Sequence, residues 1–217
     1  MARLRLAFLA SHNGSNMRAV SAACRDGSLA IEPAVVIGNN SRSGALRWAR
    51  AQGLPTYHLS GRTHPDPAAL DSAVLAALKE HRVDLVCLAG YMKRLGALAL
   101  AAYTGRILNI HPSLLPKYGG HGFYGEAVHR AVLEAGEAES GATVHLVDGE
   151  YDRGRVLAQE AVPVLAGDTV ASLAARVLEA EHRLYPETLR RVAAGEIVLD
   201  GIQCASPAPK SDIEDTP

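Results

Sequence analysis

The sequence contains little cysteine. Of its 217 residues three are cysteines, and Cys24, Cys87 and Cys204 lie far apart with no CxxC pair among them. Sparse and scattered cysteines are typical of a reducing compartment, and they do not suggest a disulfide framework. The count therefore favours a cytoplasmic protein and excludes a zinc site built on cysteine pairs.

Long apolar runs and an excess of charge of one sign are also lacking. No run of eighteen apolar residues occurs, which argues against a membrane-spanning segment. The 22 Lys and Arg are balanced by 23 Asp and Glu, so the net charge is −1. A protein that binds nucleic acid by neutralising many phosphates carries a basic excess. We therefore expect neither membrane nor nucleic acid as a partner.

Several motifs of metal, nucleophilic and nucleotide chemistry are missing. The chain contains no HExxH and no GxSxG, and the turn at 11–16 matches neither GxGxxG nor a Walker loop. These absences disfavour a hydrolytic zinc site, a serine triad, and a dinucleotide or ATP cradle in that turn. We expect a mechanism that uses no metal.

Strand-like and helix-like segments alternate over the first hundred residues. We predict strands at 4–10, 34–38, 55–59 and 83–89, and helices ending near 25 and at 44–52 and 67–82. This alternation is typical of a doubly wound, mostly parallel sheet flanked by helices. The fold class is therefore predicted to be α/β.

The second half of the chain follows a different pattern. We predict strands at 106–110, 142–147 and 156–164, helices at 126–135 and 169–194, and a glycine-rich loop at 117–125. Asp168 is the expected N-cap of the last helix, which we expect to break near Pro186. We expect the strands of this half to be mixed in direction.

Polar residues follow two predicted strands, at the edge of a parallel sheet where ligands bind. In the turn at 11–16, Gly14 allows a close backbone approach, and the Ser15 hydroxyl with the free N–H groups of a helix start suits a phosphate. An ordinary capped turn is the alternative. Asn109 and His111 lie two apart on a strand, so both face one side. They suit oxyanion stabilisation and proton transfer, or form a satisfied polar pair at a strand end.

A third polar cluster is the acidic loop at 145–154. One of its acids could contact His111 and raise the pKa of that imidazole. A calcium loop is excluded, because the acids lack the EF-hand spacing. The alternative is a solvated acidic turn.

Together these segments resemble phosphoribosylglycinamide formyltransferase, the folate-dependent enzyme of de novo purine biosynthesis. The resemblance rests on Gly14-Ser15-Asn16, Leu88-Ala89-Gly90-Tyr91-Met92, the NIHPSLLP segment at 109–116, Thr143-Val144-His145 and Asp152-Arg153-Gly154. It covers roughly residues 3–200, with the segments in the right order and at the right spacing. It implies a Rossmann-like formyltransferase fold and transfer of the formyl group of 10-formyltetrahydrofolate to the amine of 5-phosphoribosylglycinamide.

The resemblance also implies site residues. Asn109 would bind the formyl oxygen, His111 would donate a proton, and Asp152 would raise the His111 pKa. The ribonucleotide phosphate would be held by Gly14, Ser15 and Asn16, and its ribose by Glu181. The folate site would be lined by Met92, Lys93, Arg94, Leu95, Asn109 and Val147.

The same resemblance sets expectations for the chain as a whole. Residues 1–200 would form the catalytic domain, with a phosphate-binding half at about 1–100 and a folate-binding half at about 101–200. Residues 201–217 are expected to be a disordered tail. The partners would be two small molecules, and the chain would be a monomer or a homodimer.

Some positions depart from the family pattern, and other functions stay open. Arg94 stands where relatives usually have an apolar residue, and the loop at 117–125 is longer than in short-loop members. A formyltetrahydrofolate hydrolase or another formyl-folate-dependent transferase on the same fold is the alternative. A non-catalytic module that binds folate or nucleotide is a further one, disfavoured by the joint presence of Asn109, His111 and Asp152.

Overall fold

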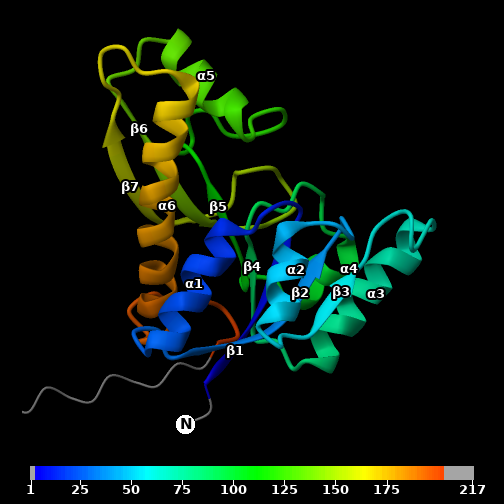
Figure 1. The fold of residues 1–217 in the computed structure, drawn as a ribbon. Coiled ribbons are helices and arrows are strands. Elements are labelled where there is room, and N and C mark those ends of the chain that lie inside the picture. Colours follow the sequence, from blue (N-terminus) through cyan, green and yellow to red (C-terminus); the bar gives the residue numbers. More distant parts are fainter. Residues whose placement is uncertain (1–2, 203–217) are drawn as a thin grey trace, which may run out of the picture.

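The first apolar segment, Leu4–Ala10, forms strand β1 at the interior of a seven-stranded sheet in the computed structural model (Figure 1), which describes residues 3–202. The strand order is β3-β2-β1-β4-β5-β6-β7. The other strands are β2 Ile31–Gly38, β3 Thr56–His58, β4 Leu85–Leu88, β5 Ile107–His111, β6 Glu139–Leu146 and β7 Val156–Pro163.

Strands β1 to β5 pair in parallel, whereas β6 and β7 run antiparallel to their neighbours. This confirms the predicted α/β fold with a mostly parallel sheet and mixed strands in the second half. The helices are α1 Ser15–Asp26, α2 Gly44–Ala51, α3 Pro67–Glu80, α4 Ala97–Ala102, α5 Glu126–Glu134 and α6 Val170–Ala193. The short helix α4 was not predicted from the sequence.

Two apolar layers cover the two faces of the sheet. Along β1, Leu6 and Phe8 join the layer that includes α1, α2 and α6, while Ala7 and Leu9 join the layer of α3 and α4. Successive side chains of a strand point to opposite faces, so a central strand that is covered on both sides must be apolar throughout. Figure 1 shows α1 and α6 side by side on one face.

The start of α6 differs from the sequence prediction. Thr169, not Asp168, is the N-cap: its hydroxyl accepts from the Ser172 backbone N–H at 3.1 Å, and the Ser172 hydroxyl accepts from the Thr169 N–H at 2.9 Å. The prediction of Asp168 as the cap is wrong. Asp168, the residue before the cap, instead accepts two hydrogen bonds from the Arg176 guanidinium, at 2.7 and 2.9 Å.

The predicted break at Pro186 is also wrong, because α6 continues through that residue. The apolar face on both sides of the proline is buried, with Tyr185 and Leu189 fully enclosed. Tyr185 also donates its hydroxyl to the Leu88 and Leu108 carbonyls, at 3.2 and 3.1 Å. This packing onto the sheet offsets the backbone hydrogen bond that a proline removes from a helix.

No helix within residues 3–202 is long and apolar enough to cross a bilayer. The expected tail at 201–217 falls almost wholly outside the described residues, which end at Ile202.

Candidate active site

A pocket of about 1110 Å³ opens at the carboxyl ends of β1, β4 and β5. The order in which strands are added to the sheet changes direction between β1 and β4. Strands β2 and β3 extend to one side of β1, while β4 and β5 lie on the other. In doubly wound sheets such a switch point leaves a crevice, and ligands bind there. The fold thus gathers the polar segments that follow these strands.

The turn after β1 exposes the first backbone N–H groups of α1. Gly14 is its N-cap, with φ +66°, and a Cβ added there would lie 2.8 Å from Cβ of Ala45. Only glycine fits both the conformation and the space. The Ser11 hydroxyl accepts from the Met92 N–H at 2.7 Å and fixes this turn to the segment after β4. The backbone N–H and the hydroxyl of Ser15, at the start of α1, are donors suited to an anion.

Asn16 and Glu181 meet beneath this turn, although they are 165 residues apart. The Asn16 amide donates to Oε2 of Glu181 at 2.7 Å, and each residue is only 7 % exposed. Burial raises the pKa of Glu181 to about 7, and the Asn16 hydrogen bond offsets part of that rise. This hydrogen bond engages one of the two N–H groups of the Asn16 side-chain amide with Glu181.

Replacement of Glu181 by glutamine should reveal this burial in the pH dependence of stability. With a pKa of about 7 in the folded protein against 4.5 ordinarily, the folded state holds its proton more tightly than the unfolded chain. Stability is therefore lost as pH rises from 4.5 to about 7, by about 3 kcal/mol. The glutamine of Glu181→Gln does not titrate. Between pH 4.5 and roughly pH 8, the unfolding free energy of this variant should therefore rise by that amount relative to the unfolding free energy of wild type, as measured by urea titration. A pH-independent difference would contradict the burial argument.

Asn109 and His111 lie on β5 and face the same side of the sheet, as predicted. Antiparallel pairing places His145 of β6 directly opposite Asn109, and Nδ2 of Asn109 lies 3.0 Å from Nε2 of His145. The other ring nitrogen of His145, Nδ1, lies 2.9 Å from the Leu146 carbonyl oxygen. A carbonyl only accepts, so Nδ1 carries the proton and Nε2 accepts from the Asn109 amide. This hydrogen bond fixes the Asn109 side chain.

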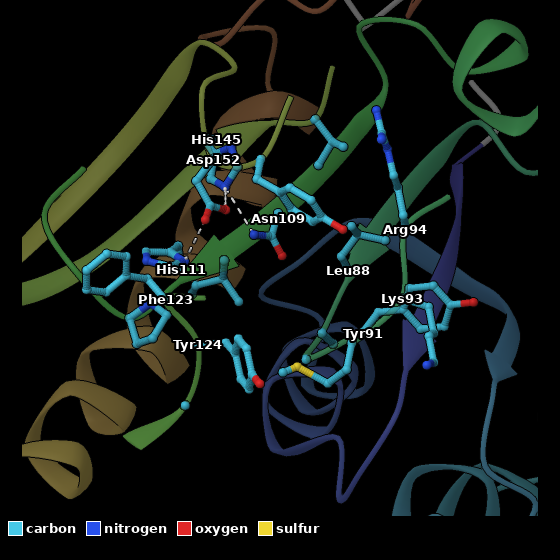
Figure 2. A pocket seen from close by; sticks show the side chains of 18 of the residues that line it. Leu88, Tyr91, Lys93, Arg94, Asn109, His111, Phe123, Tyr124, His145 and Asp152 are labelled. Carbon is cyan, nitrogen blue, oxygen red and sulfur yellow. Dashed lines mark hydrogen bonds and ion pairs between the residues drawn. The ribbon is translucent and has the colours of Figure 1, made fainter. Parts of the chain in front are cut away.

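Asp152 lies between the two histidines, as Figure 2 shows. Its Oδ2 is 3.5 Å from Nδ1 of His111, and its Oδ1 is 3.5 Å from Nε2 of His145. The Gly120 N–H donates to Oδ2 at 2.9 Å. The carboxylate has a side-chain exposure of only 12 %, and this burial, the largest single effect, raises its pKa. The Gly120 hydrogen bond and the positive charge that His111 carries when protonated act in the opposite direction, and the pKa of Asp152 lies below its usual value.

The pKa of His111 differs from the expectation. Burial lowers it most, whereas Asp152 and a hydrogen bond to the Tyr118 carbonyl raise it without reversing that effect. Asp152 thus acts in the predicted direction, but the net pKa of His111 lies below the ordinary value of 6.5. Burial thus favours the neutral imidazole, and this desolvation could not be predicted from the sequence.

The segment after β4 and the loop after β6 form the other wall of the pocket. Met92, Lys93, Arg94, Leu95 and Val147, which are predicted from the sequence to bind folate, all line it. Arg94 donates to the Gly149 carbonyl at 2.6 Å, and its guanidinium lies 5.9 Å from the centre of the Tyr151 ring. Arg94, which Figure 2 shows among the pocket side chains, therefore links the segment after β4 to the loop after β6.

The match to known proteins covers most of the chain. The profile described as formyl transferase matches residues 4–189. The chain belongs to the formyl transferase family. The resemblance seen in the sequence is thereby confirmed at the level of the family.

Named formyl transferases agree with this assignment. The chloroplastic phosphoribosylglycinamide formyltransferase of Vigna unguiculata is 44 % identical over 203 residues, which are 92 % of this chain and 65 % of that protein. Glycinamide ribonucleotide transformylase 1 from Symbiobacterium toebii superposes with a TM-score of 0.85 at 42 % identity and 92 % coverage of both chains. Phosphoribosylglycinamide formyltransferase from Brucella melitensis gives 0.81 at 44 %, covering 91 % of this chain and 99 % of that one.

In this member of the formyl transferase family the structure brings all the predicted site residues to one pocket. Its walls include Gly14, Ser15, Asn16, Met92, Lys93, Arg94, Leu95, Asn109, His111, Val147, Asp152 and Glu181. Sequence reasoning assigned no role to His145, because its position opposite Asn109 is set by the register of β5 and β6. The Tyr118 carbonyl and the Gly120 N–H were missed too, and backbone groups leave no signal in residue identity.

Proposed function

We propose that this protein transfers the formyl group of 10-formyltetrahydrofolate to the amine of 5-phosphoribosylglycinamide. The observation that carries the proposal is the cluster of Asn109, His111 and Asp152 in a pocket that also exposes the N-terminus of α1. The first feature suits acyl transfer to an amine and the second suits a phosphate on the same substrate. The names of the similar proteins agree with this function.

The reaction forms a bond between the amine nitrogen and the formyl carbon, and then breaks the bond from that carbon to the folate nitrogen. The tetrahedral species between these steps carries a negative oxygen. The Asn109 amide is oriented by His145 and has a second N–H free for that oxygen. Loss of one such donor typically lowers turnover by about 10²- to 10³-fold.

His111 manages the proton in this scheme. As a neutral imidazole it takes a proton from the attacking amine and returns it to the leaving folate nitrogen, directly or through a water. Asp152 lies 3.5 Å from Nδ1 and stabilises the imidazolium that forms between these transfers. No covalent intermediate with a side chain is needed.

The proposed substrates divide the pocket between the two halves of a catalytic domain at 1–200. The half at about 1–100 supplies Gly14, Ser15 and Asn16 for the phosphate, while Glu181 from α6 reaches the ribose. The half at about 101–200 binds the folate together with the segment from Met92 to Leu95. Leu88, Leu95 and Val147 give this part of the pocket an apolar lining suited to a flat ring.

An assay of formyl transfer tests the proposal. Purified protein with both substrates should convert the ribonucleotide to its formyl derivative, and the phosphate-free nucleoside should react at least about a hundredfold less efficiently, because the anion site is left empty. Incubation with formyl-folate alone separates the alternatives. Rapid release of formate without any amine would identify a hydrolase, and absence of turnover with binding intact would identify a non-catalytic module.

A further inference from the structure

Tyr118 occupies an unusual backbone conformation directly beside His111. Its φ is +54°, in the left-handed region that side chains other than glycine rarely adopt. Its carbonyl oxygen lies 2.8 Å from Nε2 of His111. Non-glycine residues held in this region persist where their surroundings fix them, and they gather at functional sites. The contact to His111 is a specific reason for this one.

The side chain of Tyr118 is held by an acidic residue beyond α5. Its hydroxyl donates to Oε1 of Glu137 at 2.9 Å, and the ring packs edge-to-face on Phe123 with centroids 6.1 Å apart. Lys117 also reaches Glu137, at 2.9 and 3.0 Å, but its side chain is 65 % exposed. The preceding backbone is fixed from the other side, where the Ser113 hydroxyl donates to the Lys117 carbonyl at 2.6 Å.

The Tyr118 carbonyl has a direct consequence for His111. A carbonyl oxygen accepts and cannot donate, so Nε2 of His111 must carry a hydrogen. In the neutral imidazole Nδ1 is then unprotonated, and it faces Oδ2 of Asp152 at 3.5 Å. Without the carbonyl, the carboxylate would favour the opposite tautomer, with the hydrogen on Nδ1.

We propose that Tyr118, held in place by Glu137, is a positioning residue that sets the tautomer of His111 and makes Nδ1 the nitrogen that takes up and releases the proton. Its part in catalysis rests on the proposed formyl transfer. The tautomer itself is a property of the free protein and can be measured without turnover.

Nitrogen NMR of protein labelled in the histidine rings tests this proposal. The His111 signals are assigned by their loss in His111→Ala, and the shifts of Nδ1 and Nε2 show which one is protonated. In wild type the hydrogen should reside on Nε2. In Tyr118→Phe and Glu137→Ala, which both remove the anchoring hydrogen bond, the population with the hydrogen on Nδ1 should rise. Their kcat should fall by about five- to tenfold with both KM values within about twofold, since the lost interaction is one hydrogen bond.

Lys117→Ala is the matched control. It removes the ion pair to Glu137 but leaves the Tyr118 hydroxyl bond, so both the tautomer and kcat should stay at wild-type values. The proposal is overturned if Tyr118→Phe and Glu137→Ala leave the His111 tautomer unchanged, whatever happens to kcat. A changed tautomer in a protein that transfers no formyl group would uphold the positioning and reject the proposed reaction instead.

Discussion

Replacement of His111 by alanine is expected to lower kcat for formyl transfer by at least about a hundredfold, with KM values changed by less than about threefold. His111 is the only proton acceptor that the proposed mechanism uses, and it lies beside Asn109 on β5, where the formyl group would be attacked. Truncation removes the acceptor for the amine proton and leaves the binding surfaces intact. Steady-state kinetics with each substrate varied in turn gives both constants.

Asp152→Asn should have a similar effect on kcat for a different reason. The amide can still accept from the Gly120 N–H, so the loop keeps its anchor. It carries no charge to stabilise the imidazolium of His111, however, and the proton transfer becomes unfavourable. His64→Ala serves as the control, because His64 lies outside the pocket. A fall of less than tenfold in either site variant, with folding verified by circular dichroism, would remove that residue from the mechanism.

Ser15→Glu is expected to raise the KM for the ribonucleotide by at least about a hundredfold while the KM for formyl-folate stays within about threefold. A carboxylate about 4 Å from a phosphate costs about 4 kcal/mol near a protein surface. Ser15 is the first residue of α1, where an acidic side chain favours the helix, so the variant should fold.

Ala22→Glu is the matched control for this experiment. It adds the same charge on an exposed position of the same helix, outside the pocket. Its KM values should match those of wild type. An unchanged ribonucleotide KM in Ser15→Glu would place the phosphate elsewhere and disprove the assignment of Gly14, Ser15 and Asn16.

The sequence pattern predicted those features of the structure that depend only on residues close together in the chain. The alternation of Leu4, Leu6 and Phe8 predicted the first strand, and the polar stretch at 11–16 predicted the turn before the first helix. The two-residue spacing of Asn109 and His111 placed both on one side of a strand. Asp168, by contrast, was predicted as a helix cap because the residue type fits, whereas its contact with Arg176 and the Thr169–Ser172 pair decided otherwise.

The sequence by itself determined the α/β class, the glycine turn of the proposed anion site and the residue types of the proposed chemistry, because periodicity and motif are properties of neighbouring residues. Tertiary structure alone decided which of these residues meet. Antiparallel pairing of β5 with β6 put His145 opposite Asn109, and packing of α1 on α6 buried Glu181 against Asn16. It also decided their proton affinities, because burial outweighs the effect of Asp152 on the pKa of His111. Desolvation depends on everything packed around a group, and no short stretch of sequence encodes it.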